Sequence, residues 1–85
     1  MSEAFVDIEQ LVRSLVTPLV DVPEEVEITS DELEDGSLLV EISCNADDAG
    51  KVIGRQGRVI NAIRTLCRAA GSRYGFHVEV ELIDD

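Results

Sequence analysis

The sequence of 85 residues predicts one small α+β domain, in which helices cover one face of a three-stranded sheet. Two observations predict this class. Apolar residues recur at helical spacing near the N-terminus and again after residue 58, and they alternate with polar residues in three further segments. The expected order of elements is helix, strand, strand, helix, helix, strand.

The first half of the chain predicts a helix and a pair of strands. The helix is expected over residues 3–16, and Pro18 closes it. Short strands are expected around residues 26–28 and over residues 38–44, and the Asp35-Gly36 reversal signal between them predicts a hairpin. The second strand is expected to place three side chains on one face: Val40, Ile42 and Cys44.

The second half predicts two helices and a last strand. A short helix capped by Asn45 or Asp47 leads to a glycine-rich interruption at residues 54–57. A longer helix begins at Arg58, and Gly71 is its expected end. The apolar face of this helix comprises Val59, Ile60, Ile63, Leu66, Cys67 and Ala70. The strand over residues 76–83 alternates, with inward side chains expected at Phe76, Val78, Val80 and Leu82 and outward ones at His77, Glu79 and Glu81.

The charge of the chain is unevenly distributed. Its net value of −11 by itself argues against a nucleic-acid partner, because phosphate binding depends on Lys and Arg. Residues 51–73, however, hold six basic side chains and no acid, a local charge of +6, whereas 18 acids against Arg13 give −17 elsewhere. The six are Lys51, Arg55, Arg58, Arg64, Arg68 and Arg73. The net charge therefore conceals a local cationic surface.

The cationic segment begins with GKVIGRQGRVIN, residues 50–61. Its glycine spacing fits neither a Walker A phosphate loop nor a G-x-G-x-x-G dinucleotide fingerprint. It fits a turn between two helices, where Gly54 and Gly57 allow the backbone to approach a ligand closely. The turn leads into the N-terminus of the helix from Arg58, whose free N–H groups favour anions. A phosphate backbone is the expected anion.

Other functional classes find little support in the sequence. Cys44, Cys67 and His77 are not at metal-ligand spacing, so we expect no metal or cofactor and two reduced, largely buried thiols. The adjacent carboxylates Asp47 and Asp48 are expected to cap a helix, and no nucleophile is paired with a base, so we expect no enzyme. The N-terminus lacks signal-peptide features and no apolar run approaches about 20 residues, so we expect a cytoplasmic protein without a membrane span.

Residues 52–60, VIGRQGRVI, resemble the V-I-G-x-x-G-x-x-I signature of the KH domain. The expected element order resembles the bacterial, type II form of that fold. The resemblance covers nearly the whole chain, which is similar to the KhpA family of small bacterial RNA-binding proteins. It implies a single KH domain over residues 1–85 with its GxxG loop at 54–57.

The resemblance also implies a function and a set of site residues. KH domains clamp about four single-stranded nucleotides against the GxxG loop. An RNA-binding protein acting as a post-transcriptional regulator or RNA chaperone is implied, with Val40 or Ile42 opposite the loop across the base groove. The RNA-binding residues implied are Lys51, Ile53, Gly54, Arg55, Gln56, Gly57 and Arg58, with Arg64 as an extension. The family further implies a homodimer, or a heterodimer with a Jag (KhpB)-type KH protein.

Two alternatives to the RNA clamp stay open at this point. The first is a protein-interaction module that keeps the KH fold and works mainly through a partner KH protein, which the acidic surface and the scarcity of aromatics permit. The second is a glycine turn that merely joins two helices, although a connector does not require a local charge of +6. Arg64 and Arg68 share a helical face and belong either to the cationic track or to an ordinary solvated surface. Tyr74 is expected to seal the edge of the core rather than to reach RNA.

Overall fold

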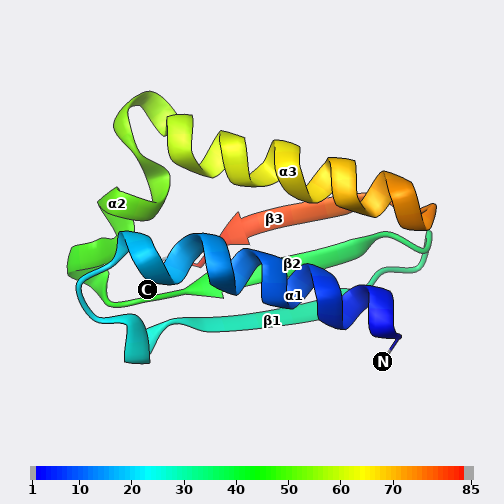
Figure 1. Ribbon diagram of the computed structural model, residues 1–85, viewed down its shortest axis with the longest axis horizontal. Helices are drawn as coiled ribbons and strands as arrows, with labels where there is room; N and C mark the ends of the chain where they lie inside the picture. The colour runs from blue at the N-terminus through cyan, green and yellow to red at the C-terminus, as the bar shows by residue number, and fades with distance from the viewer. Residues whose placement is uncertain (1, 84–85) are drawn as a thin grey trace.

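Two long helices lie side by side across one face of a three-stranded sheet (Figure 1). This computed structural model describes residues 2–83, so residues 1, 84 and 85 of the predicted 1–85 domain lie outside the described residues. The elements follow in the predicted order, which confirms the fold class. They are α1 (Glu3–Val16), β1 (Glu27–Glu32), β2 (Leu38–Ser43), α2 (Ala49–Ile53), α3 (Arg58–Tyr74) and β3 (Val78–Leu82).

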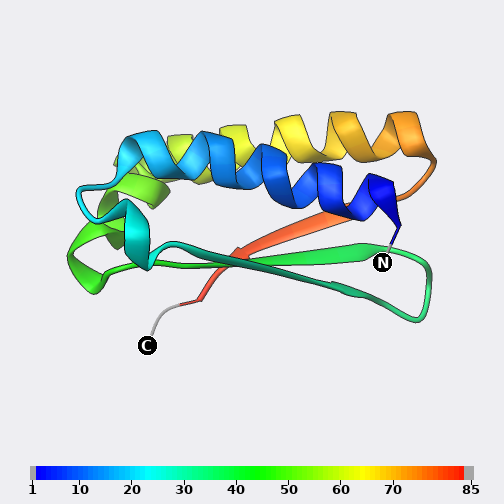
Figure 2. The ribbon, with the colours of Figure 1, turned by 60° about the horizontal axis from the view of Figure 1, so that its bottom comes forward.

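The sheet has the order β1-β2-β3 and is mixed. β1 and β2 form the predicted antiparallel hairpin, with Ile28 opposite Ile42, and Gly36 takes a φ of 87° in the turn between them. β3 runs parallel to β2, with Val40 opposite Val80. Figure 2 shows both long helices on the same side of the sheet, which leaves the other face open.

The core lies between the helices and the covered face of the sheet. Three side chains of the central strand β2 are fully buried there, and α1 and α3 contribute the apolar stripes that the sequence predicts. Burying one such aliphatic side chain contributes about 1.5–3 kcal/mol. The buried apolar residues of the long helices are Ile8, Val12 and Val16 of α1 and Ile60, Ile63 and Cys67 of α3.

The prediction that the long helix ends at Gly71 is wrong. α3 continues to Tyr74 and ends at Gly75, whose left-handed backbone (φ 89°) places its N–H on the Ser72 carbonyl while the Phe76 N–H bonds to the Gly71 carbonyl. Gly71 itself is buried against β3. A Cβ at this position would lie 2.6 Å from Val78 Cγ2 and 2.7 Å from the Phe76 carbonyl oxygen, so this glycine serves close packing rather than helix termination.

Leu66 also departs from the sequence prediction. The helical spacing predicts it on the apolar face of α3, but 49% of its surface is exposed because it lies at the margin of the stripe formed by Ile63 and Cys67. Both cysteines are free thiols, and burial raises the pKa of Cys67 to about 11. The structure thus keeps Cys67 a neutral apolar core residue, as predicted.

The aromatic residues pack at the end of the helices remote from the GxxG segment. Phe5 and Phe76 meet edge to face with ring centroids 5.1 Å apart, and the exposed Tyr74 ring stacks on Phe76 at 6.0 Å. The Tyr74 hydroxyl donates a hydrogen bond of 2.9 Å to Asp7 on α1. Tyr74 therefore seals the edge of the core, as expected.

Candidate functional site

The segment between α2 and α3 is a tight turn built on two glycines. Gly54 ends α2 with φ 77° and ψ 169°, and its N–H donates to the Gly50 carbonyl at 2.9 Å. One turn of 3-10 helix, Arg55–Gly57, follows, and the Gly57 N–H donates to the Gly54 carbonyl at 3.1 Å. In Figure 1 this turn projects beyond the start of α3.

The two glycines of the turn meet different constraints. The φ and ψ angles of Gly54 lie in a region that is essentially restricted to glycine. A Cβ there would also lie 2.4 Å from Val59 Cγ2 and 2.8 Å from the Val59 backbone nitrogen. Gly57 is left-handed (φ 75°, ψ 13°), but a Cβ there would be 3.5 Å from its nearest neighbour, Asn61 Nδ2. Gln56 also adopts positive φ (58°) without being glycine.

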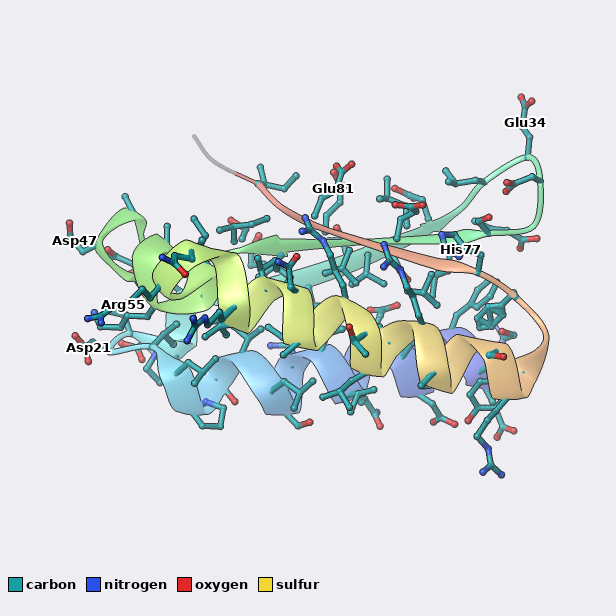
Figure 3. The ribbon with its side chains drawn as sticks, turned by 90° about the horizontal axis from the view of Figure 1, so that it is seen from above. Asp21, Glu34, Asp47, Arg55, His77 and Glu81 are labelled. Atoms are coloured by element: carbon teal, nitrogen blue, oxygen red, sulfur yellow. The ribbon has the colours of Figure 1, made fainter. Side chains whose placement is uncertain are left out.

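The cationic side chains of the turn are exposed. Arg58 Nη2 lies 3.5 Å from Gln56 Oε1, and within the described residues neither Arg55 nor Arg58 forms an ion pair. Figure 3 shows Arg55 at the extremity of the molecule. α3 begins at Arg58 without a side-chain N-cap hydrogen bond, so its N-terminal partial positive charge adds to that of the arginines.

The apolar residues beside the turn divide into supporting and accessible ones. Val52 is fully buried and Ile60 nearly so, whereas 41% of the Ile53 surface is exposed next to Gly54. Val40 and Ile42 are both fully buried under the helices. The expectation that one of them lines an open groove opposite the loop is therefore wrong, because the helices already cover that face of β2.

Lys51 is held by two carboxylates. Its Nζ lies 3.0 Å from Asp48 Oδ1 and 3.1 Å from Asp21 Oδ2. Hydrogen bonds to Asp48 and then to Asp21 raise the pKa of Lys51. This arrangement joins α2 to the connection between α1 and β1, a contact for which the sequence carries no local signal.

Asp48 does not cap α2, contrary to the sequence prediction. Its side chain is almost fully buried and makes no cap hydrogen bond to α2; it accepts the backbone N–H groups of Asp21 at 3.1 Å and Val22 at 3.0 Å. Burial by itself would raise the pKa of Asp48, but the hydrogen bonds from Asp21, Lys51 and Val22 together outweigh it, so the pKa lies below its usual value. Asn45 does cap the preceding 3-10 turn by accepting from the Asp47 N–H at 2.9 Å, as predicted.

Arg64 and Arg68 differ although they share a helical face. Arg64 Nε donates to the Val80 carbonyl at 3.1 Å, and its Nη1 donates to Asn61 Oδ1 at 3.2 Å. The Arg64 guanidinium therefore lies against β3, an edge strand of the sheet, whereas Arg68 is exposed. Of its five N–H groups these bonds use two, so Arg64 keeps donors for another ligand.

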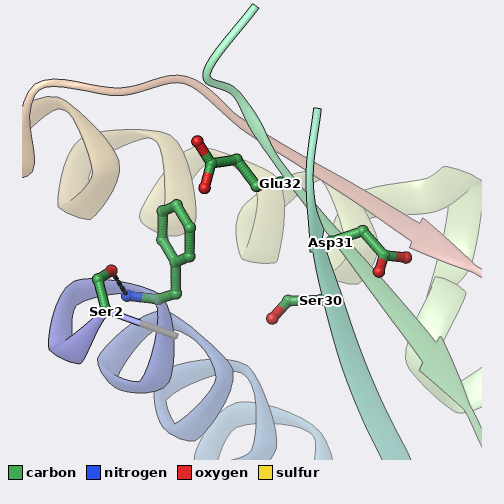
Figure 4. Close-up of a pocket in the computed structure, with 5 residues that line it drawn as sticks. Ser2, Ser30, Asp31 and Glu32 are labelled. Carbon is green, nitrogen blue, oxygen red and sulfur yellow. Dashed lines mark hydrogen bonds between the residues drawn. The ribbon is translucent and has the colours of Figure 1, made fainter. Parts of the chain in front are cut away.

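A pocket opens between the start of α1 and β1, away from the GxxG turn (Figure 4). Phe5 gives it an apolar wall, and its other lining residues carry hydroxyls or carboxylates: Ser2, Ser30, Asp31 and Glu32. The Ser30 hydroxyl donates to Glu9 at 2.5 Å. With carboxylates and no cation in its lining, this pocket is unsuited to phosphate and does not belong to the cationic site.

A helix–GxxG–helix unit packed on a three-stranded mixed sheet defines the chain as a KH domain. More narrowly, the chain belongs to the KhpA/KhpB KH-domain family, whose sequence model matches residues 9–82. This is a family of KH domains and not of enzymes, which confirms the prediction of a non-enzymatic protein.

Curated relatives support the assignment over nearly their whole length. The RNA-binding protein KhpA of Listeria monocytogenes is 47% identical over 76 residues, covering 89% of this chain and 99% of the relative. KhpA of Bacillus subtilis is 40% identical over 77 residues, covering 91% and 94%. KhpA of Streptomyces coelicolor is 42% identical over 77 residues, covering 91% and 92%.

Solved structures support the fold alone. Aquifex aeolicus Era bound to GDP and aluminium fluoride matches all of this chain with a TM-score of 0.63 at 17% identity. Era in complex with a fragment of 16S ribosomal RNA matches with a TM-score of 0.64 at 16% identity. This chain spans 33% of the length of each Era chain. Among residues 2–83, no helix has the length and apolar character needed to cross a membrane.

Proposed function

We propose that this protein binds single-stranded RNA and clamps the RNA backbone at the GxxG turn. One observation carries the proposal: Arg55 and Arg58 are exposed and have no ion-pair partner among the described residues, in a chain with 18 acids. Acidic side chains are abundant enough to neutralise them, so their positive charge is kept for an external anion. The curated relatives, named RNA-binding proteins, support the same conclusion.

The proposed clamp assigns a role to each part of the turn. Gly54 and Gly57 let a phosphate approach the backbone, and the start of α3 adds its partial positive charge. Arg55, Gln56 and Arg58 supply donors to phosphate oxygens. In this account the exposed Ile53 contacts a base, and Lys51 and Arg64 extend the site on either side.

The proposed function also includes how strongly the protein binds RNA and which protein partner it uses. A single KH domain over residues 1–85 with aliphatic base contacts binds weakly, because stacking on aromatic rings is missing near the turn. A homodimer, or a heterodimer with a Jag (KhpB)-type KH protein, raises the effective concentration of a second site. The proposed role is cytoplasmic, as a post-transcriptional regulator or RNA chaperone.

A charge-reversing loop variant tests the clamp. Arg55→Asp with Gln56→Asp lowers the net charge by three at the exposed turn, and we expect RNA affinity to fall about tenfold or more at about 50 mM salt. Fluorescence anisotropy of a labelled single-stranded RNA pool measures the affinity at about 50 and 200 mM salt, and circular dichroism checks the fold.

A matched variant separates the turn from the overall charge. Ser72→Asp with Arg73→Asp makes the same charge change at exposed positions near the far end of α3. We expect this control to lose much less affinity than the loop variant. Equal losses in the two variants, or no loss in either, would contradict a clamp at the GxxG turn.

A further inference from the structure

Lys51 lies between two aspartate carboxylates at nearly equal distances, and these two carboxylates differ in burial and in their other hydrogen bonds. Asp48 is almost fully buried, and its two oxygens also accept the backbone N–H groups of Asp21 and Val22. The Asp21 side chain is 78% exposed, and it reaches Lys51 from the connection between α1 and β1. Asp48 is therefore a fixed part of the fold, whereas the Asp21 carboxylate lies on the surface.

The two contacts also differ in how easily an external anion can replace them. Removing Asp48 from Lys51 would leave a buried carboxylate with one partner fewer, which is unfavourable. An exposed ion pair such as Lys51 with Asp21 is weak and screened by salt. An anion arriving from solvent at Lys51 therefore displaces Asp21 first.

The position of this ion pair relates it to the GxxG turn. Lys51 belongs to α2, the helix that ends at Gly54, and Figure 3 shows Asp21 and Arg55 at the same end of the molecule. Hydrogen bonding to Asp48 holds the Lys51 ammonium in place at 3.0 Å and leaves it partly exposed. The Asp21 carboxylate thus occupies a place on a preoriented cation that a phosphate oxygen of bound RNA can take.

We propose that Lys51, positioned by Asp48, is a phosphate-binding group that Asp21 occupies in the RNA-free protein, so that Asp21 limits the affinity for RNA. The inference rests on the proposed function at the GxxG turn and adds an intramolecular competitor to it. RNA binding then exchanges a Lys51–Asp21 pair for a Lys51–phosphate pair.

Releasing Lys51 from Asp21 tests the inference. Asp21→Asn keeps the shape of an exposed side chain and removes the competing charge. We expect the single-stranded RNA pool to bind about two- to fivefold more tightly. The slope of log affinity against log salt should become more negative, because added salt no longer weakens a competing Lys51–Asp21 pair in the RNA-free protein. Fluorescence anisotropy between about 50 and 200 mM salt measures both quantities.

Asp47→Asn is the control for the charge change in Asp21→Asn, because each variant removes one negative charge. Asp47 is exposed, Figure 3 places it at the same end of the molecule, and it forms no ion pair with Lys51. Its variant removes one negative charge without releasing the lysine, so we expect a smaller gain and an unchanged salt slope. If Asp21→Asn and Asp47→Asn change affinity and salt slope equally, Asp21 acts only through general repulsion and the inference is wrong.

The Lys51→Gln variant tests whether the affinity gain of Asp21→Asn depends on Lys51. In Lys51→Gln, which retains a hydrogen-bond donor for Asp48, the further change Asp21→Asn should give no more than the Asp47→Asn gain. If Lys51→Gln does not fold, the comparison of Asp21→Asn with Asp47→Asn still tests whether Asp21 competes with RNA for Lys51. Retained RNA binding in the Arg55→Asp, Gln56→Asp protein would overturn the proposed function. Lost RNA binding in that protein, together with equal affinities and salt slopes for Asp21→Asn and Asp47→Asn, would overturn only the role of Asp21.

Discussion

The two glycines of the GxxG turn are not equivalent residues. Gly54 combines a glycine-only backbone conformation with contact distances that exclude a Cβ, whereas Gly57 has only the left-handed conformation. We expect Gly54→Ala to lower the free energy of unfolding by about 2–4 kcal/mol and Gly57→Ala by about 1–2 kcal/mol. Urea unfolding measures both values. Equal losses would contradict the close approach of Gly54 to Val59.

Asp48 makes the stability of the fold depend on pH. Because its pKa is lower in the folded protein than the ordinary value of 3.8, its contribution is present above that value and is lost as the pH falls through the folded pKa. Asp48→Asn should therefore be less stable than the wild type at pH 7, and this difference should shrink below about pH 3.8.

Urea unfolding of both proteins between pH 7 and about pH 2.5 measures this difference. Asp47→Asn is the control, because Asp47 is exposed and binds neither Lys51 nor the Asp21 and Val22 backbone. We expect it to follow the wild type throughout. A destabilisation by Asp48→Asn that stays constant over the whole pH range would show that the charge of Asp48 does not hold the α1–β1 connection.

At the level of elements, the path of α3 over β3 depends on a glycine inside the helix. An alanine at Gly71 would gain about 1 kcal/mol of helix propensity but would meet the Phe76 carbonyl and Val78. We expect Gly71→Ala to be destabilised by about 1–3 kcal/mol net, as in other overpacked sites. Gly50→Ala is the matched control, because Gly50 is helical and a Cβ there has open space.

Thermal unfolding of these two variants checks the packing of α3. Gly50→Ala should be neutral or more stable by up to about 1 kcal/mol, since it lowers the entropy of the unfolded chain. If Gly71→Ala were stabilised to the same extent as Gly50→Ala, the close contact between α3 and β3 would be refuted.

The elements that the sequence predicts are those whose pattern is local. The stripe of α1, the alternation in β2 and β3 and the Asp35-Gly36 turn follow from spacing and turn chemistry alone, and the structure confirms them. Gly71 is ambiguous in sequence, because a glycine that ends a helix and one that admits a neighbouring strand look alike. The hydrogen bonds from Asp21 and Val22 to Asp48 span 27 and 26 positions of the chain, so no local sequence pattern predicts them.

The candidate site is predictable to a similar extent. The segment VIGRQGRVI and the absence of acids from residues 51–73 indicate the turn and its cations from the amino-acid sequence alone. Which cations are unpaired is not predictable, because within residues 2–83 Arg55 has no ion pair, while Lys51 meets Asp21 and Asp48 only through the fold. The same holds for Val40, whose burial depends on where α1 and α3 lie on the sheet.

Across the whole molecule, the acidic side chains of the open sheet face lie apart from the arginines of the GxxG turn. The open face of the sheet carries Glu27, Asp31, Glu41, Glu79 and Glu81, while Arg55 and Arg58 lie at one end of the helical layer. Such a distribution steers a polyanion towards the GxxG turn and away from the open face. Two or three phosphate contacts there predict a slope of log affinity against log salt of about −1.4 to −2.1.

That slope can be measured by titrating the RNA pool at several salt concentrations below about 200 mM. A slope near zero would mean that phosphates contribute little and that the cations of the turn have another role. A much steeper slope would require more cations than the turn provides, and would point to the whole length of α3 as the contact surface.

Amide chemical-shift mapping of the labelled protein with a short single-stranded RNA shows where RNA binds without altering any residue. We predict that the largest shifts fall on residues 51–60 and that Thr29, Glu41, Glu79 and Glu81 on the open face of the sheet stay unchanged. Shifts centred on the open face or on the outer surface of α3 around Leu66, with residues 51–60 unaffected, would show that RNA does not bind at the GxxG turn.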